Sequence, residues 1–180
     1  MPADTTAIRF EVNGLGRVGI YYIAETEQPA PFALFIHGLP GSEKNHDIAQ
    51  ALRALGWHIL VIHLGGTWGS DGDYDLLQHP VDAIAALEYA LTYPVKIDPS
   101  RIAVLGYSMG SRAALSAAHA DARFGAVVSL GGFSDFSEVM LDPSFYPSVV
   151  PFLRGVTPDT LSKQFMRLGD GLQPDRKSVV

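Results

Sequence analysis

The sequence contains no cysteine, so disulfides, thiolate catalysis and zinc–thiolate sites are excluded. It also lacks long hydrophobic runs, because its apolar stretches fall far short of the roughly 20 residues that cross a bilayer. The N-terminus, "MPADTTAIRFEVNG", has no basic segment followed by an apolar core, as a secretory signal would. These absences predict a soluble, cytoplasmic protein without a membrane partner.

Positive charge is scarce as well. The formal net charge is -6, and no Lys or Arg cluster forms a stripe. This balance argues against nucleic acid and anionic membranes as partners. Hydrophobic residues make up 47% of the 180 residues and charged residues 18%, which is typical of one globular domain rather than a disordered chain.

Apolar runs alternate with helical patterns along the first 132 residues. A hairpin is predicted from 7–12 and 16–26, buried strands at 31–38, 57–64, 101–107 and 125–132, and helices from Ser42 to Gly56, Pro80 to about Tyr93 and Met109 to about Ala120. Each crossover is long enough for a parallel connection. The sequence therefore predicts an α/β fold, a mostly parallel sheet with helices on both faces and an N-terminal antiparallel hairpin. From Phe133 onward, scattered prolines predict loops or short helices.

Two motifs are better explained without a ligand. "GLGRVG" (14–19) matches a dinucleotide fingerprint, but the β-rich "IYYIAET" follows it where a helix is required, which favours a turn between two strands. "DGDYD" (71–75) has calcium-loop spacing, but Leu76 occupies the position that requires glycine, which favours a solvated acidic loop. No cofactor or metal is expected.

The segment "RIAVLGYSMGSRAA" (101–114) carries the strongest chemical signal. Its Gly-x-Ser-x-Gly motif stands where a strand turns into a helix, so that Ser108 would sit at the tip of a strained turn. Gly106 and Gly110 would give the helix room to fold back on the strand. The positive end of that helix would then favour negative charge developing beside Ser108.

Two backbone N–H groups are candidates for an oxyanion hole, which needs at least two donors. One belongs to Met109. The other would come from "HGLPGS" (37–42), the loop after a neighbouring strand. Leu39 is the favoured donor there, because Pro40 has no N–H.

Together these segments resemble the α/β-hydrolase family, in particular its branch of single-domain esterases, dienelactone hydrolases and S9 peptidases. The matching pieces are "FIHGLPGS", "GWHILVIHLGGTWGSDGDY", "DPSRIAVLGYSMGSRAAL" and "AVVSLGG". The resemblance implies Ser108 as nucleophile, the Leu39 and Met109 amides as oxyanion hole, and the strand at 32–37 beside that at 102–107. One departure is the loop after Leu64, which lacks the arginine that the family places before its first glycine.

The family order is serine, acid, histidine, and this chain has a single histidine after Ser108. That residue, His119, lies 11 positions further along the same helix, roughly 16 Å away. His63 ends a strand expected two strands from Ser108, roughly 10 Å away. His37 is the nearest by topology; the resemblance gives it a structural role in the oxyanion loop, and its use as a base stays open.

The remaining candidates are weaker. His46 and His58 are expected on a helix and at a strand start, away from the serine, and His79 stands beside a helix start. Asp135 follows the last predicted strand, where some relatives carry their acid, although a polar residue that begins a cap region is the favoured interpretation. An acid without a histidine would leave Ser108 unactivated.

The resemblance also implies two further strands after Gly132, and no later run resembles them. The strand at 125–132 would then be an exposed apolar edge. We therefore expect residues 1–180 to form a single incomplete domain, with a core sheet over 1–132 and a cap-like region and truncated tail over 133–180.

Three functional hypotheses follow. The first is a serine hydrolase acting on an ester, thioester or amide of a small-molecule or peptide acyl substrate, with the triad Asp and His missing from this chain. The second is a non-catalytic binding or interaction protein that uses the open sheet edge, for example as a homo-oligomer. In the third, a partner chain supplies the missing strands and histidine.

Overall fold

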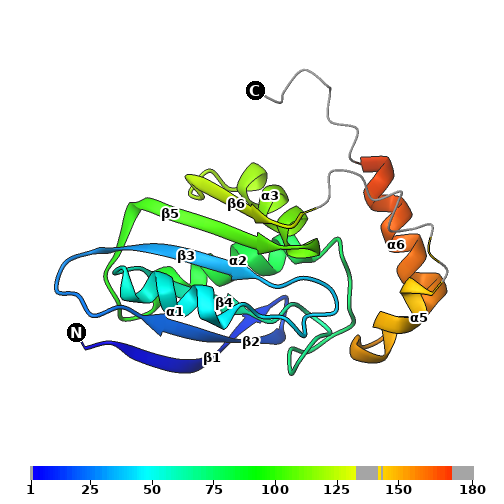
Figure 1. Ribbon diagram of the computed structural model, residues 1–180, viewed down its shortest axis with the longest axis horizontal. Helices are drawn as coiled ribbons and strands as arrows, with labels where there is room; N and C mark the ends of the chain where they lie inside the picture. The colour runs from blue at the N-terminus through cyan, green and yellow to red at the C-terminus, as the bar shows by residue number, and fades with distance from the viewer. Residues whose placement is uncertain (1, 133–141, 143, 172–180) are drawn as a thin grey trace, which may run out of the picture.

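The computed structural model describes residues 2–132, 142 and 144–171 (Figure 1). Its six strands are β1 (Asp4–Val12), β2 (Leu15–Ile23), β3 (Ala30–Ile36), β4 (His58–Ile62), β5 (Ile97–Tyr107) and β6 (Ala126–Leu130). They form one sheet in the order β1-β2-β4-β3-β5-β6. β1–β2 and β2–β4 are antiparallel, while β3 pairs in parallel with β4 and β5, and β5 with β6. The predicted fold class is confirmed, as is the adjacency of the strands that precede His37 and Ser108.

Helices cover both faces of this sheet. They are α1 (His46–Ala54) on one face and α2 (His79–Thr92) and α3 (Met109–Ala120) on the other, whereas α5 (Phe145–Val149), a 3-10 turn at Val150–Phe152 and α6 (Pro158–Gly171) lie beyond one end of the sheet (Figure 1). Alternate side chains of β3 point to opposite faces. Leu34 and its neighbours on one face pack against α2 and α3, whereas Phe35 on the other shares a cluster with Ala49 of α1. All seven residues of β3 are buried, as the continuous apolar run predicts.

Two predicted boundaries are wrong. Helix α1 begins at His46 rather than after Ser42, because Asn45 takes a left-handed conformation with φ 50° directly before it. β5 begins at Ile97 rather than at the predicted Arg101, because Ile97 pairs with Ala30 across a register shift.

The region after Phe133 contains a helix that the sequence analysis missed. α6 is 14 residues long, and its side chains Leu161, Phe165 and Leu168 are buried against α5. The Thr157 hydroxyl accepts from the Thr160 N–H at 3.2 Å at the start of this helix. Prolines suggested loops, yet Pro158 is compatible with a first helical turn. Asp135 and residues 172–180 of the tail lie outside the described residues.

The two edges of the sheet differ. β1 closes one edge as part of the hairpin, while β6 stands at the other and has no buried residue. Within 2–132, 142 and 144–171, no strand pairs with the outer side of β6. Val128 of β6 is 40% exposed and Leu115 of α3 is 55% exposed. The predicted exposed apolar edge is therefore present in the described chain. None of the described helices is long and apolar enough to span a membrane.

Candidate active site

Ser108 occupies the turn between β5 and α3, with φ 51° and ψ -120°. A positive φ is uncommon for any residue other than glycine, so the turn is strained. The Ser108 N–H donates to the Leu130 carbonyl at 2.8 Å, and the Ser111 hydroxyl donates to the Gly106 carbonyl at 2.8 Å. These bonds tie the turn to β6 and to its own helix.

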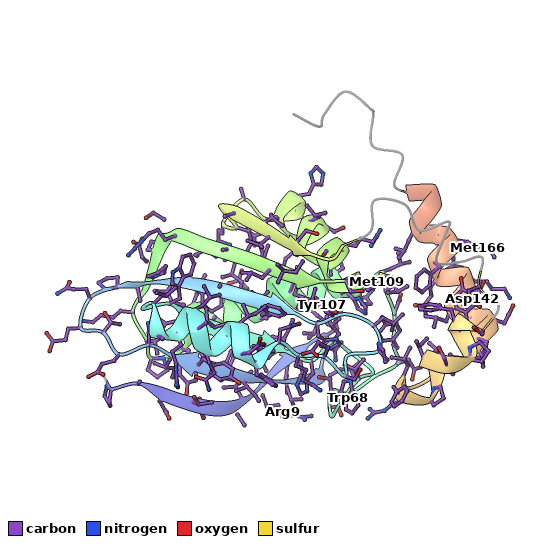
Figure 2. All side chains as sticks on the ribbon, viewed as in Figure 1. Arg9, Trp68, Tyr107, Met109, Asp142 and Met166 are labelled. Carbon is purple, nitrogen blue, oxygen red and sulfur yellow. The ribbon has the colours of Figure 1, made fainter. Side chains whose placement is uncertain are left out.

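The two glycines of the motif are required by close backbone contacts. A Cβ at Gly106 would lie 2.3 Å from the Gly110 carbonyl oxygen, and one at Gly110 would lie 2.3 Å from the Ile36 carbonyl oxygen. Real Cβ atoms do not approach so closely, so α3 could not pack on β5 and β3 with a side chain at either position. Figure 2 shows Tyr107 and Met109, on either side of Ser108, at the end of the sheet that faces α5 and α6.

The loop after β3 lies directly against this turn. A Cβ at Gly38 would be 3.0 Å from the Ser108 Cβ. Leu39 packs against the cluster that joins Met109 to α5 and α6. Among the described residues the Leu39 N–H makes no hydrogen bond, and Met109, as the first residue of α3, has no acceptor four residues back in the helix. Both predicted donors thus belong to segments that meet beside Ser108.

His37 is a buried part of the scaffold of this loop. Its Nε2 accepts from the Leu64 N–H at 3.2 Å, so the ring proton lies on Nδ1, which donates to the Gly38 carbonyl at 2.7 Å. Burial lowers the pKa of His37 to about 4. With both ring nitrogens engaged, His37 is not available as a base for Ser108. The structural role that the resemblance implied fits this geometry.

The other histidines do not complete a triad with Ser108. His58 starts β4, at the opposite end of the parallel strands from Ser108, and His119 stands in the last turn of α3. His63 Nδ1 donates to the Trp68 carbonyl at 2.9 Å, and β3 separates its strand from β5.

Two histidines stand at helix starts. His46 Nδ1 is 2.8 Å from the Tyr22 hydroxyl. His79, the first residue of α2, is buried edge-to-face against Tyr74, and burial lowers its pKa to about 3. His79 Nε2 has no hydrogen-bond partner, and no carboxylate orients the ring in the described structure. A catalytic histidine needs such an orienting group.

Arg17 of β2 fills the space beside the loop that lacks the family arginine. Its Nε donates to Asp82 of α2 at 2.9 Å, and the Gly65 N–H donates to the other Asp82 oxygen at 2.8 Å. A Cβ at Gly65 would be 2.8 Å from the Arg17 guanidinium. Burial raises the pKa of Asp82, although the Gly65 N–H and Arg17 oppose this shift. The sequence analysis missed this pair because its two members are far apart in the chain.

The motifs "GLGRVG" and "DGDYD" lie in a hairpin turn and in an acidic loop, and neither arranges its residues around one ligand. "GLGRVG" spans the β1–β2 turn and the start of β2, so no helix follows its glycines. Asp71 pairs with Arg9, Asp75 accepts from the Leu77 N–H at 2.9 Å, and Asp73 lies beside Gly155. Across the described ranges, no group of three or more acidic or histidine side chains could hold a metal ion.

A mostly parallel sheet flanked by helices, with a serine on a strained strand-to-helix turn, is the architecture of an α/β-hydrolase. Residues 46–168 match the prolyl oligopeptidase family of peptidases, and the chain belongs to this family.

Similar proteins include a quorum-quenching protein, a thiohydrolase and an α/β hydrolase. The chain is 31% identical to the quorum-quenching protein AidA of Acinetobacter baumannii over 147 residues, covering 78% of this chain and 48% of AidA. It is 33% identical to the thiohydrolase apmlB of Arthrinium phaeospermum over 123 residues, covering 66% of this chain and 40% of apmlB. The crystal structure of the α/β hydrolase GrgF from Penicillium sp. sh18 superposes with a TM-score of 0.68 at 23% identity, covering 81% of this chain and 52% of GrgF. The chain thus spans about half the length of the relatives it matches.

Proposed function

We propose that this chain carries the nucleophile and oxyanion hole of a serine hydrolase. Ser108 Oγ attacks the carbonyl carbon of an ester, thioester or amide, and its proton passes to a general base. The N–H groups of Met109 and Leu39 stabilise the oxyanion, and the collapse of the intermediate expels the leaving group. Water then hydrolyses the acyl-enzyme. The observation that carries the proposal is the strained backbone of Ser108, with Gly38 packed against it.

The acyl group of a small molecule or peptide would lie toward α5 and α6. Met109 and Leu39 belong to the same apolar cluster as Tyr146, Val149 and Phe165. An apolar surface beside the nucleophile suits an acyl chain. A thioester is a reasonable member of this class, since one relative is a thiohydrolase.

The general base would come from polypeptide outside these 180 residues, because the positions and contacts of the six histidines leave none as a partner for Ser108. Without a complete triad, backbone donors and binding alone still give roughly 10³–10⁴-fold catalysis over water. We therefore expect slow but measurable reaction at Ser108.

A fluorophosphonate probe tests the proposal, because the oxyanion hole accelerates attack of the Ser108 hydroxyl on its phosphorus even where the general base is absent, although the labelling is then slow. We expect labelling of the unaltered chain, mapped to Ser108 by mass spectrometry, and loss of that labelling in Ser108→Ala. Ser116→Ala, two turns further along α3, is the matched control and should label like the unaltered chain. Equal labelling of the unaltered chain and Ser108→Ala would remove Ser108 from the proposal.

A second candidate is a non-catalytic interaction protein that pairs through β6. It is favoured by the exposed outer edge of this strand and by Val128, which is 40% exposed. A second copy pairing at that edge would form a dimer whose mass is measurable by light scattering. Val128→Lys should then give a monomer, whereas an unaltered chain that is monomeric at tens of micromolar contradicts this candidate.

A further inference from the structure

Trp68 has an unfavourable conformation and an unfavourable environment. Its φ is 41°, in the left-handed region that bulky residues rarely adopt. Its side chain is also 41% exposed, although indole is a large apolar group. Strained residues of this kind persist where the surrounding contacts hold them, and they gather at functional sites.

The contacts of Trp68 converge on the loop beside Ser108. Its indole Nε1–H donates to the Pro40 carbonyl at 3.0 Å. A Cβ at Gly41 would lie 2.7 Å from His37 ring atoms on one side and 2.7 Å from Trp68 Nε1 on the other. The segment 38–41 therefore passes between two rings, one buried and one exposed.

The indole is held in place by its own neighbours. Phe152 stacks on it with ring centroids 6.2 Å apart and an angle of 24° between the planes. The Lys44 ammonium lies 4.2 Å from the indole centroid, a favourable cation–π distance. The Trp68 carbonyl also accepts from His63 Nδ1. These contacts fix the direction in which Nε1–H points.

We propose that Trp68 is a positioning residue for the oxyanion loop, a role that rests on the function proposed above. By holding the Pro40 carbonyl, its indole N–H fixes the turn that carries the Leu39 N–H beside Ser108. His37 holds the same turn from inside through the Gly38 carbonyl. The loop is thus held at the carbonyls on either side of Leu39, and strain at Trp68 is the cost of placing the outer contact.

Trp68→Phe is the decisive variant, because it keeps an aromatic ring for Phe152 and deletes the N–H. The phosphonyl oxygen occupies the oxyanion position during labelling. We therefore expect the maximal inactivation rate of Ser108 by the fluorophosphonate to fall roughly 10- to 100-fold, with the half-saturating concentration unchanged. Hydrogen exchange at the amides of Gly38, Leu39 and Gly41 should become faster.

Two controls separate the hydrogen bond from other effects. Trp57→Phe alters the other tryptophan, which packs on the α1 face of the sheet, and should change neither measurement. Phe152→Leu removes the stacking partner but keeps the N–H, and should lower the inactivation rate less than Trp68→Phe.

The outcomes distinguish this inference from the proposed function. Exchange at 38–41 that stays unchanged in Trp68→Phe overturns the inference, and so does faster exchange with an unchanged inactivation rate. If the unaltered chain is not labelled at Ser108, the proposed function fails, while faster exchange in Trp68→Phe still supports the role of Trp68 in holding the loop.

Discussion

β3 and β6 are both short strands that pair in parallel with β5, yet their surroundings are opposite. Every residue of β3 is buried between helices on the two faces, whereas no residue of β6 is buried. Their roles near Ser108 differ in the same way. β3 leads into the loop that packs against Ser108, while β6 supplies a single carbonyl, that of Leu130, to the Ser108 N–H. Stability and site geometry are therefore concentrated in the centre of the sheet, and the edge contributes mainly strand pairing.

Truncating one apolar side chain in each of the two strands should give the largest difference in the free energy of unfolding. Leu34→Ala on β3 removes a side chain that is 0% exposed, and it should lower the free energy of unfolding by about 2–5 kcal/mol. Val128→Ala on β6 should change it by no more than about 0.5 kcal/mol, because its side chain already contacts water. Urea unfolding of both variants checks the difference. Equal losses would show that β6 is covered in solution.

Acid should weaken the centre through its buried histidines. The pKa of His37 is lowered to about 4 and that of His79 to about 3, from 6.5. Both are neutral when folded, while the unfolded chain takes up protons below pH 6.5. The free energy of unfolding should therefore fall as the pH drops below 6.5, by about 2 kcal/mol per histidine between pH 7.5 and 5.

Urea unfolding at the two pH values measures this loss. His79→Phe keeps a ring against Tyr74 and should remove its share of about 2 kcal/mol from the pH dependence, to which the lowered pKa values of His46, His58 and His63 also contribute. A profile that is the same in His79→Phe and the unaltered chain would assign the acid sensitivity to other groups.

The smallest expected change in stability comes from Ser108, at the tip of the turn between β5 and α3. Ser108→Gly should raise the free energy of unfolding by about 1 kcal/mol, because glycine adopts positive φ without the strain of serine. The gain is a net value, since glycine also loses more entropy on folding. Thermal unfolding measures it, with Ser116→Gly on α3 as the control that should be destabilised. A loss of stability in Ser108→Gly would show that the turn is not strained.

The sequence predicts the central strands and the Ser108 turn better than it predicts the region after Phe133. The continuous apolar runs of β3 and β4 identify buried strands, and the spacing of Gly106, Ser108 and Gly110 identifies a strand-to-helix turn. These signals are local. α6 was missed because prolines before it outweighed the helical spacing of Leu161, Phe165 and Leu168, which could have revealed it.

Contacts between distant segments were the other omission. Arg17 lies in a glycine-rich turn motif and Asp82 in an ordinary helical pattern, and nothing in either segment indicates that they meet. Trp68 is similar, since a tryptophan in a Gly- and Asp-rich loop does not reveal a bond to Pro40. Such pairs depend on the order of strands in the sheet, which only the assembled fold supplies.

The Arg17–Asp82 pair has a consequence for how this protein can vary. The guanidinium occupies the volume that a side chain at position 65 would need, and a buried Asp82 left without a cation would be costly, about 3–5 kcal/mol. Positions 17, 65 and 82 should therefore change together among homologues. A homologue that lacks the arginine on β2 should carry another cation beside position 82 or an uncharged residue there, so the two buried charges are kept or lost together.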